Sequence, residues 1–258
     1  MMTLCRTSFL NQDDIDWVRR FLADSPFFRS YFEGALEGLR AGADNRYVHI
    51  GRDRQGVILG FDFDGLTAFS PVGRLRDQEL RLLAACPQRL ELQLASSDAP
   101  MMRALLGERI EMTLDQRLYE RRTAGATWFP EARRLGPADL AAVSLFSRVH
   151  NPHTVFSAWM LELPFLAATD GDGIVATAGT LARTGDEAVI GNVVTRADRR
   201  GRGHARRLVE SLCALLAREG VATVHLLTTS DNAPACAVYD AAGFAVAGRF
   251  CQMDVRPA

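Results

Sequence analysis

Two hydrophobic periods alternate along the second half of the chain. Apolar residues at every second position, bounded by Gly-Asp turns, predict strands, and apolar residues three or four positions apart predict helices. The strands are expected at 165–169, 174–181, 187–195, 224–228 and 245–255, and the helices at 205–218 and from Pro234. This order predicts a mixed, mostly antiparallel sheet with helices between its later strands.

The first half of the chain shows the same succession. Helices are expected over 12–40 with a break at Ser25-Pro26, over 77–85 and over 100–106, and strands at 47–50, 57–63, 66–69, 90–94 and 113–119. The segment 97–100 (Ser-Asp-Ala-Pro) even mirrors 230–234 (Ser-Asp-Asn-Ala-Pro). We therefore expect an internal repeat, with chance similarity of two βαβα patterns as the alternative. A small, polar connector at 121–127 divides the chain into expected domains 1–124 and 125–258.

Between the strand ending at Thr195 and the helix from Ala205 lies a turn built almost entirely of arginine and glycine. Glycines allow backbone N–H groups to converge at the positive end of the following helix, which favours binding of a phosphate group. Arginines at the rim add candidate guanidinium contacts: Arg196, Arg199, Arg200, Arg202, Arg206 and Arg207. The turn lacks the Lys-Ser/Thr pair of a P-loop, and Arg206 replaces the third small residue of a dinucleotide fingerprint.

Two motifs resemble the GNAT superfamily of acyl-CoA-dependent N-acyltransferases. Arg200-x-x-Gly203-x-Ala205 is similar to the pyrophosphate loop of that family. The segment 232–244 is similar to its Asn-x-x-Ala-x-x-aliphatic-Tyr…Gly-Phe segment, in register at Asn232, Ala235, Val238, Tyr239, Gly243 and Phe244. The resemblance covers roughly the last half of the chain. It implies an α/β (α+β) fold, and with the repeat it predicts two GNAT-like lobes, each a mixed, mostly antiparallel sheet flanked by helices.

The resemblance implies a site for acetyl-CoA, used as co-substrate, and roles for individual residues. The expected CoA-binding residues are Val193, Val194, Thr195, Arg200, Gly201, Arg202, Gly203, His204, Ala205 and Asn232. Backbone groups of 193–195 would run beside the pantetheine arm, and Asn232 would contact that arm or cap the next helix. Tyr239 is the expected catalytic acid, which would donate a proton to the departing thiolate; a packing aromatic is the alternative.

The general base is less well defined. Many relatives carry a glutamate in the strand before the loop, whereas this chain has Asn192 there. Glu162, His150 and His153 are candidates, but a solvated surface position is the favoured interpretation of each. Cys236 has no activating base beside it in sequence, so we expect direct transfer rather than an acyl-cysteine intermediate. In this family the region between Arg148 and Pro164 borders the acceptor pocket.

Composition and charge narrow the class of protein. The net charge of -1 argues against a nucleic-acid partner, so the arginine turn is read as a local anion site. Five widely spaced cysteines without a Cys-x-x-Cys pair suggest neither disulfides nor a metal site and fit a cytoplasmic location. No stretch approaches the roughly 20 apolar residues of a membrane span, and the N-terminus has no sustained apolar run.

The predicted function is transfer of an acetyl group from acetyl-CoA directly to the amine of a small molecule or peptide. The first lobe has a single glycine in the corresponding turn, 70–75, and is not expected to hold CoA in the usual way. If it replaces the second subunit of a dimeric relative, the protein is a monomer or a weak dimer. The alternatives are a non-catalytic acyl-CoA-binding regulator, or an acyltransferase with another acyl donor or a hydroxyl acceptor.

Overall fold

The computed structural model describes residues 10–40, 45–63, 66–152 and 156–258. The chain divides into two compact units: residues 1–117, 229–231 and 248–258 form unit 1, and residues 118–228 and 232–247 form unit 2. Both units mix helices with a mostly antiparallel set of strands, so the expected fold class is confirmed. The expected domains, 1–124 and 125–258, follow chain order, whereas the compact units also exchange short segments.

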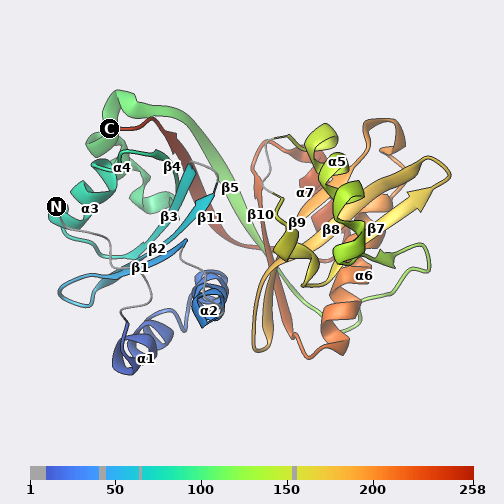
Figure 1. Ribbon diagram of the computed structural model, residues 1–258, viewed down its shortest axis with the longest axis horizontal. Helices are drawn as coiled ribbons and strands as arrows, with labels where there is room; N and C mark the ends of the chain where they lie inside the picture. The colour runs from blue at the N-terminus through green and yellow to red at the C-terminus, as the bar shows by residue number, and fades with distance from the viewer. Residues whose placement is uncertain (1–9, 41–44, 64–65, 153–155) are drawn as a thin grey trace. The chain divides into compact units, whose positions relative to one another are not determined.

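Unit 1 follows the predicted order of elements (Figure 1). Its elements are α1 (Gln12–Phe21), α2 (Pro26–Arg40), β1 (Arg46–Ile50), β2 (Gly56–Phe63), β3 (Leu66–Gly73), α3 (Asp77–Ala84), β4 (Arg89–Ala95), α4 (Ala99–Leu106), the first part of β5 (Ile110–Arg122) and most of β11 (Ala245–Val255). The strand order is β1-β2-β3-β4-β11-β5. β3 and β4 pair in parallel, and β4 and β11 pair antiparallel.

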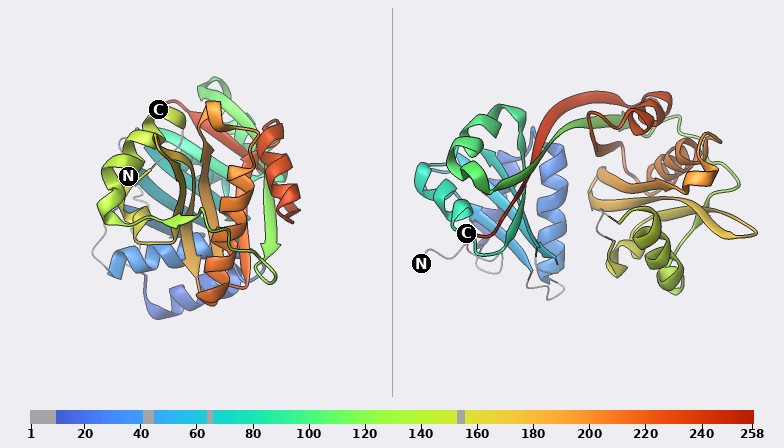
Figure 2. Two further views of the ribbon diagram at one scale, coloured as in Figure 1. Left: turned by 90° about the vertical axis from the view of Figure 1, so that its right-hand side faces the viewer. Right: turned by 90° about the horizontal axis from the view of Figure 1, so that it is seen from above.

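Helices cover both faces of the unit 1 strands, and side-chain alternation explains the two layers (Figure 2). Leu90, Leu92 and Leu94 of β4 point to one face, where they pack against residues of α3 and α4. On the other face α2 supplies aromatic contacts, among them Phe27, whose ring centroid lies 5.7 Å from that of Phe250 on β11.

Unit 2 repeats this succession. It contains β6 (Arg133–Arg134), α5 (Leu140–His150), β7 (Phe165–Asp170), β8 (Gly173–Thr184), β9 (Glu187–Thr195), α6 (His204–Arg218), β10 (Thr223–Thr229, of which only Thr229 lies in unit 1) and α7 (Ala233–Ala241), with the end of β5 and the start of β11. The strand order is β5-β10-β9-β8-β7-β6. As in unit 1, a three-stranded antiparallel meander is followed by a parallel pair, here β9 with β10.

The two faces of the unit 2 strands carry different helices. Leu166 and Ala168 of β7 belong to a core shared with α6 and α7. The alternate residues Phe165 and Ala167 belong to a second cluster with Val143 of α5 and with the short helix η5 (Ala158–Leu161). This period of two is what the sequence pattern predicted for these strands.

The expected internal repeat is present in the order of elements and in the direction of each strand pair. The last strand of each repeat, β5 or β11, takes a place in the strand order of the other repeat. The sequence did not indicate this exchange. β11 follows α7 in the second repeat but pairs with β4 of unit 1 along Phe250–Val255. β5 follows α4 of the first repeat but lies next to β10 in the strand order of unit 2.

Candidate functional site

The Arg-Gly turn connects β9 to α6 through the short helix η6 (Ala197–Arg199). Gly201 and Gly203 have φ angles of +74° and +77°, the left-handed region that favours glycine. Gly203 is the N-cap of α6, so the chain passes directly from this turn into a helix of 15 residues. The glycines therefore place the loop backbone at the helix N-terminus, as the sequence predicted.

The backbone donors of this turn are unused. Among the described residues, the N–H groups of the segment 201–206 donate to no acceptor, whereas the N–H of Arg207 already bonds to the Gly203 carbonyl at 3.1 Å. These donors lie at the positive end of the α6 dipole. A helix N-terminus with free N–H groups and flanking glycines fits a phosphate or diphosphate.

Two of the rim arginines belong to an ionic cluster with three aspartates. Arg199 contacts Asp170 at 2.9 Å, Asp172 at 3.1 Å and Asp198 at 2.7 Å, and Arg196 contacts Asp198 at 2.8 Å. The hydrogen bond from Arg199 lowers the pKa of Asp170, and that from Arg196 lowers the pKa of Asp198. The cluster ties η6 to the β7–β8 turn and leaves these two arginines largely neutralised.

The other rim arginines differ from one another. Arg206 pairs with Glu210 at 2.9 Å, and Arg207 pairs with Glu131. Arg200 donates to the Thr195 carbonyl at 3.2 Å, and neither Arg200 nor Arg202 has an acidic partner among the described residues. Of the six arginines predicted as candidates for phosphate contacts, four are paired with carboxylates, and Arg200 and Arg202 are not.

His204 occupies the first turn of α6 and is half-buried. Burial lowers the pKa of His204, and the positive charges of Arg207 and Arg202 lower it further. The Nδ1 atom lies 3.5 Å from a guanidinium nitrogen of Arg207. The imidazole is therefore mainly neutral at pH 7, and a negative charge beside it would favour its protonation.

β9 and β10 separate next to the turn. They pair in parallel only from Glu187↔Thr223 to Val189↔His225, although β9 continues to Thr195 and β10 to Thr229. Beyond this point β9 keeps its partner β8 on the other edge, with Val194 opposite Thr177 and Thr195 opposite Ala176. The edge of 193–195 that faces β10 thus carries backbone groups outside the ladder, where an extended ligand can form hydrogen bonds.

A β-bulge lies in the part of β9 that has separated from β10. Gly191 pairs with Gly179 and Val194 with Thr177, so Asn192 and Val193 both face Ala178. Asn192 has a φ of +50° and is only 6% exposed. Its Nδ2 lies 3.3 Å from the Met160 Sδ, and its Oδ1 is buried without a hydrogen-bond partner among the described residues. The sequence showed the asparagine but gave no sign of the bulge.

The helix α7 carries the second motif. Asn232 is its N-cap, and its side chain accepts a hydrogen bond from the Ala235 N–H at 3.2 Å, which confirms the capping role. Tyr239 is 5% exposed and packs against Tyr119 and Phe244, with ring centroids 5.6 and 6.0 Å away. Burial, followed by the neighbouring Cys236 and Tyr119, raises the pKa of Tyr239, so the phenol keeps its proton at neutral pH.

The remaining candidates are Glu162, His150, His153 and Cys236, the last of which lies on α7. Glu162 is exposed and follows η5, while the ring of His150, at the end of α5, lies 4.8 Å from that of Phe146. His153 lies outside the described residues. Cys236 is buried in the core of unit 2. Among the described residues no group of three His, Cys, Asp or Glu side chains is placed to hold a metal ion, and none of their helices is long and apolar enough to cross a membrane.

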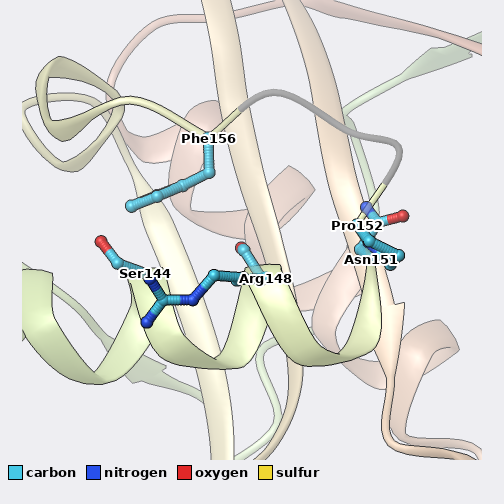
Figure 3. A pocket seen from close by; sticks show the side chains of 6 residues that line it. Ser144, Arg148, Asn151, Pro152 and Phe156 are labelled. Atoms are coloured by element: carbon cyan, nitrogen blue, oxygen red, sulfur yellow. The ribbon is translucent and has the colours of Figure 1, made fainter.

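A pocket of about 250 Å³ opens beside the C-terminal half of α5 (Figure 3). It is lined by Ser144, Ser147, Arg148, Asn151, Pro152 and Phe156. The sequence reasoning placed an acceptor region at 148–164 but missed the two serines. The spacing of Ser144, Ser147, Arg148 and Asn151 is i, i+3, i+4 and i+7, a polar stripe on one helix face that the sequence does contain.

Comparison with known proteins agrees with this geometry. Residues 137–244 match the acetyltransferase (GNAT) family. The structure is similar to a Drosophila protein with a TM-score of 0.75 and 13% identity, over 96% of this chain and 97% of that one. A GCN5-related N-acetyltransferase from Sphaerobacter thermophilus matches with a TM-score of 0.60 and 20% identity, over 87% and 86% of the two chains.

A second GCN5-related N-acetyltransferase, from Kribbella flavida, matches with a TM-score of 0.61 and 14% identity, over 86% of this chain and 93% of that one. At these identities the structural matches show a shared fold. No curated protein matches the sequence significantly.

Residues 137–244 contain a domain of the GNAT acetyltransferase family, and this match supports acyl transfer from acyl-CoA. Unit 1 repeats the order of elements of unit 2.

Proposed function

We propose that the protein is an N-acetyltransferase that passes the acetyl group of acetyl-CoA directly to the amine of a small molecule or peptide. The observation that carries the proposal is the row of free N–H donors at 201–206, beside the edge of β9 that leaves β10. The N–H groups from Gly201 to Arg206 would bind the diphosphate, with Arg200 and Arg202 at the rim. Backbone groups of 193–195 would bind the pantetheine arm.

In the reaction, the amine nitrogen forms a bond to the carbonyl carbon of the thioester while the carbon–sulfur bond breaks. The amine loses one proton and the thiolate gains one. Backbone N–H groups of the β9 edge are suited to stabilise the charge that develops on the carbonyl oxygen. Tyr239 is protonated and is the proposed donor to the thiolate.

The interior of β9 carries Asn192 and no candidate general base, and its one carboxylate, Glu187, stands at the start of the strand. An amine that is already deprotonated at working pH needs none. Asn192 also supports a second candidate function, a protein that binds acyl-CoA without turnover. These two functions differ in thiol release and not in CoA binding.

The test is thiol release from acetyl-CoA with a panel of amines, measured beside CoA affinity, for the wild type and Tyr239→Phe. We expect Tyr239→Phe to lower kcat about 10²-fold, in the range of positioned proton transfer, with CoA affinity unchanged. Phe146→Tyr, on α5, serves as a control for a changed phenol count. Equal turnover in Tyr239→Phe removes the tyrosine from the mechanism, and CoA binding without any release supports the second candidate.

A further inference from the structure

The pocket beside α5 is lined by polar groups that have no partner in the part of the chain that the structure describes. Ser147 is only 7% exposed, yet its hydroxyl forms no hydrogen bond with any described residue. Ser144, Arg148 and Asn151 likewise have no side-chain partner among the described residues. Arg148 is exposed and Ser144 and Asn151 are half-buried, so these groups are open to the pocket and can donate hydrogen bonds to a ligand.

The one charged residue that lines the pocket is positive. Arg148 supplies a guanidinium, and the lining residues include no carboxylate. In Figure 3 the Arg148 side chain extends beside Ser144, with the Phe156 ring on the opposite wall. This contrasts with Arg206 and Arg207 on α6, which are both paired with glutamates. An unpaired guanidinium repels a polyamine and attracts an anion.

The wall of this pocket is connected to the bulge of β9. The Phe156 ring packs against Phe165 at 5.7 Å and belongs to the cluster that contains Met160. Met160 in turn contacts the Asn192 amide at 3.3 Å. Packed residues therefore connect the wall of the pocket to the strand that would hold the thioester.

We propose that this pocket binds the carboxylate of the acceptor, so that the acceptor is a small amine that also carries a carboxylate, such as an amino acid or a short peptide. The inference rests on the proposed acetyl transfer. The fork of Arg148 matches a carboxylate in two parallel hydrogen bonds, and Ser144 and Ser147 donate to the same group. One guanidinium balances the single charge of a carboxylate, whereas a phosphate carries about -1.5 to -2 at pH 7.

The size of the pocket agrees with this class. Its volume of about 250 Å³ lies below the roughly 300–1,000 Å³ of pockets for drug-sized ligands. Pro152 and Phe156 supply the apolar wall, which suits the carbon skeleton of a small acceptor.

The experiment uses the full chain and three matched probe sets: amino acids, their carboxamides, and amines without an anion such as putrescine, with O-phosphoethanolamine as the phosphate arm. Thiol release from acetyl-CoA gives kcat and KM for each. Calorimetric titration of the N-acetyl amino acids and their amides into CoA-saturated protein measures binding without turnover. We expect a carboxylate probe to be preferred over its amide in both measurements.

Arg148→Gln is expected to raise the KM of the preferred carboxylate acceptor about 10- to 100-fold, with the KM for acetyl-CoA and for the amide unchanged. Ser147→Ala is expected to have a smaller effect in the same direction. Arg122→Gln is the matched control, because Arg122 is an exposed arginine of unit 2 without an acidic partner among the described residues.

Failure of this inference is distinguishable from failure of the proposed function. Absence of CoA binding contradicts the proposed function itself. With CoA bound, a preference for putrescine, for amides or for O-phosphoethanolamine overturns the carboxylate assignment. The absence of any carboxylate binding in the titration overturns it as well, and so does an equal loss for all acceptors in Arg148→Gln.

Discussion

The N-termini of α6 and α3 occupy the same place in the two repeats, and they differ in what meets their backbone donors. Each helix follows the third strand of a meander and precedes a parallel strand. At α6 the N–H groups of 201–206 are free. At α3 the Glu79 carboxylate, 3% exposed, accepts from the Arg76 N–H at 2.7 Å and from the Arg52 N–H at 2.9 Å.

One side chain therefore separates a capped helix N-terminus from an open one. The glutamate at the third helical position of α3 accepts from the N-cap N–H, and its negative charge repels an anion at the helix N-terminus. At α6 that position is Arg206, which points to Glu210 on the following turn. The comparison explains physically why unit 1 is degenerate, and it predicts a single CoA site per chain.

The largest effect on CoA affinity is expected from a carboxylate placed in the Arg-Gly turn before α6. Gly203→Asp should lower CoA affinity about 1,000-fold, because like charges about 4 Å apart repel by about 4 kcal/mol at an effective dielectric constant of 20. Gly125→Asp is the control for backbone strain, since Gly125 also has a positive φ, +75°; its Cβ position is open, whereas that of Gly203 lies 2.8 Å from the Arg207 guanidinium. Calorimetric titration with CoA checks the pair, and near-normal affinity in Gly203→Asp would mean that CoA binds elsewhere.

Removing the Glu79 cap from the turn before α3 should lower the stability of unit 1 without creating a CoA site. Glu79→Ala leaves two backbone donors without their acceptor and is expected to lower the free energy of unfolding by about 2 kcal/mol. Glu37→Ala, an exposed glutamate of α2, should change it by less than about 0.5 kcal/mol. Chemical denaturation measures both. A second CoA equivalent bound by Glu79→Ala would contradict this expectation and show that the Glu79 cap alone keeps CoA from unit 1.

The reciprocal change should make α6 resemble α3. Arg206→Glu puts a carboxylate at the third helical position, where it can accept from the Gly203 N–H, and should lower CoA affinity about tenfold while the fold is retained. Arg206→Ala removes the same arginine but adds no acceptor, so its loss of CoA affinity should be smaller. Equal losses in the two variants would attribute the effect to the lost arginine.

The smallest effect concerns pH. His204 has a lowered pKa in the free protein, so its contribution to stability is complete above the unfolded pKa of about 6.5 and is lost as the pH falls through the folded value. A bound diphosphate should raise this pKa and make binding take up a proton. CoA affinity should then rise roughly threefold between pH 8 and pH 6 in the wild type. His204→Asn should show a weaker pH dependence in titrations over the same range, and identical slopes would exclude His204.

Much of the fold was predictable because it is encoded locally. The alternation at 165–195 and the helical period at 205–218 gave the strands and the helix within a few residues. Glycines at 201 and 203 indicated the turn, because a positive φ depends on the residue itself. The capping role of Asn232 followed from its position three residues before Ala235.

The site was less predictable where it depends on distant partners. Arg199 and Arg200 are neighbours in sequence, yet only Arg199 meets Asp170, which lies 29 residues away. The exposed fraction of Tyr239 and the direction of its pKa shift required the packing around α7. Asn192 looked like an ordinary strand residue, because a bulge depends on the register of two strands.

By itself the sequence determined the order of elements, the repeat, the Arg-Gly turn and the second motif, since hydrophobic period and backbone preference act over a few residues. Only the tertiary structure decided which arginines stay unpaired, which helix N-terminus is capped by Glu79, how the last strands are exchanged, and that Ser144, Ser147 and Arg148 line one pocket. The physical reason is that charge pairing and strand pairing join residues far apart in the chain, and their outcome depends on the folded arrangement.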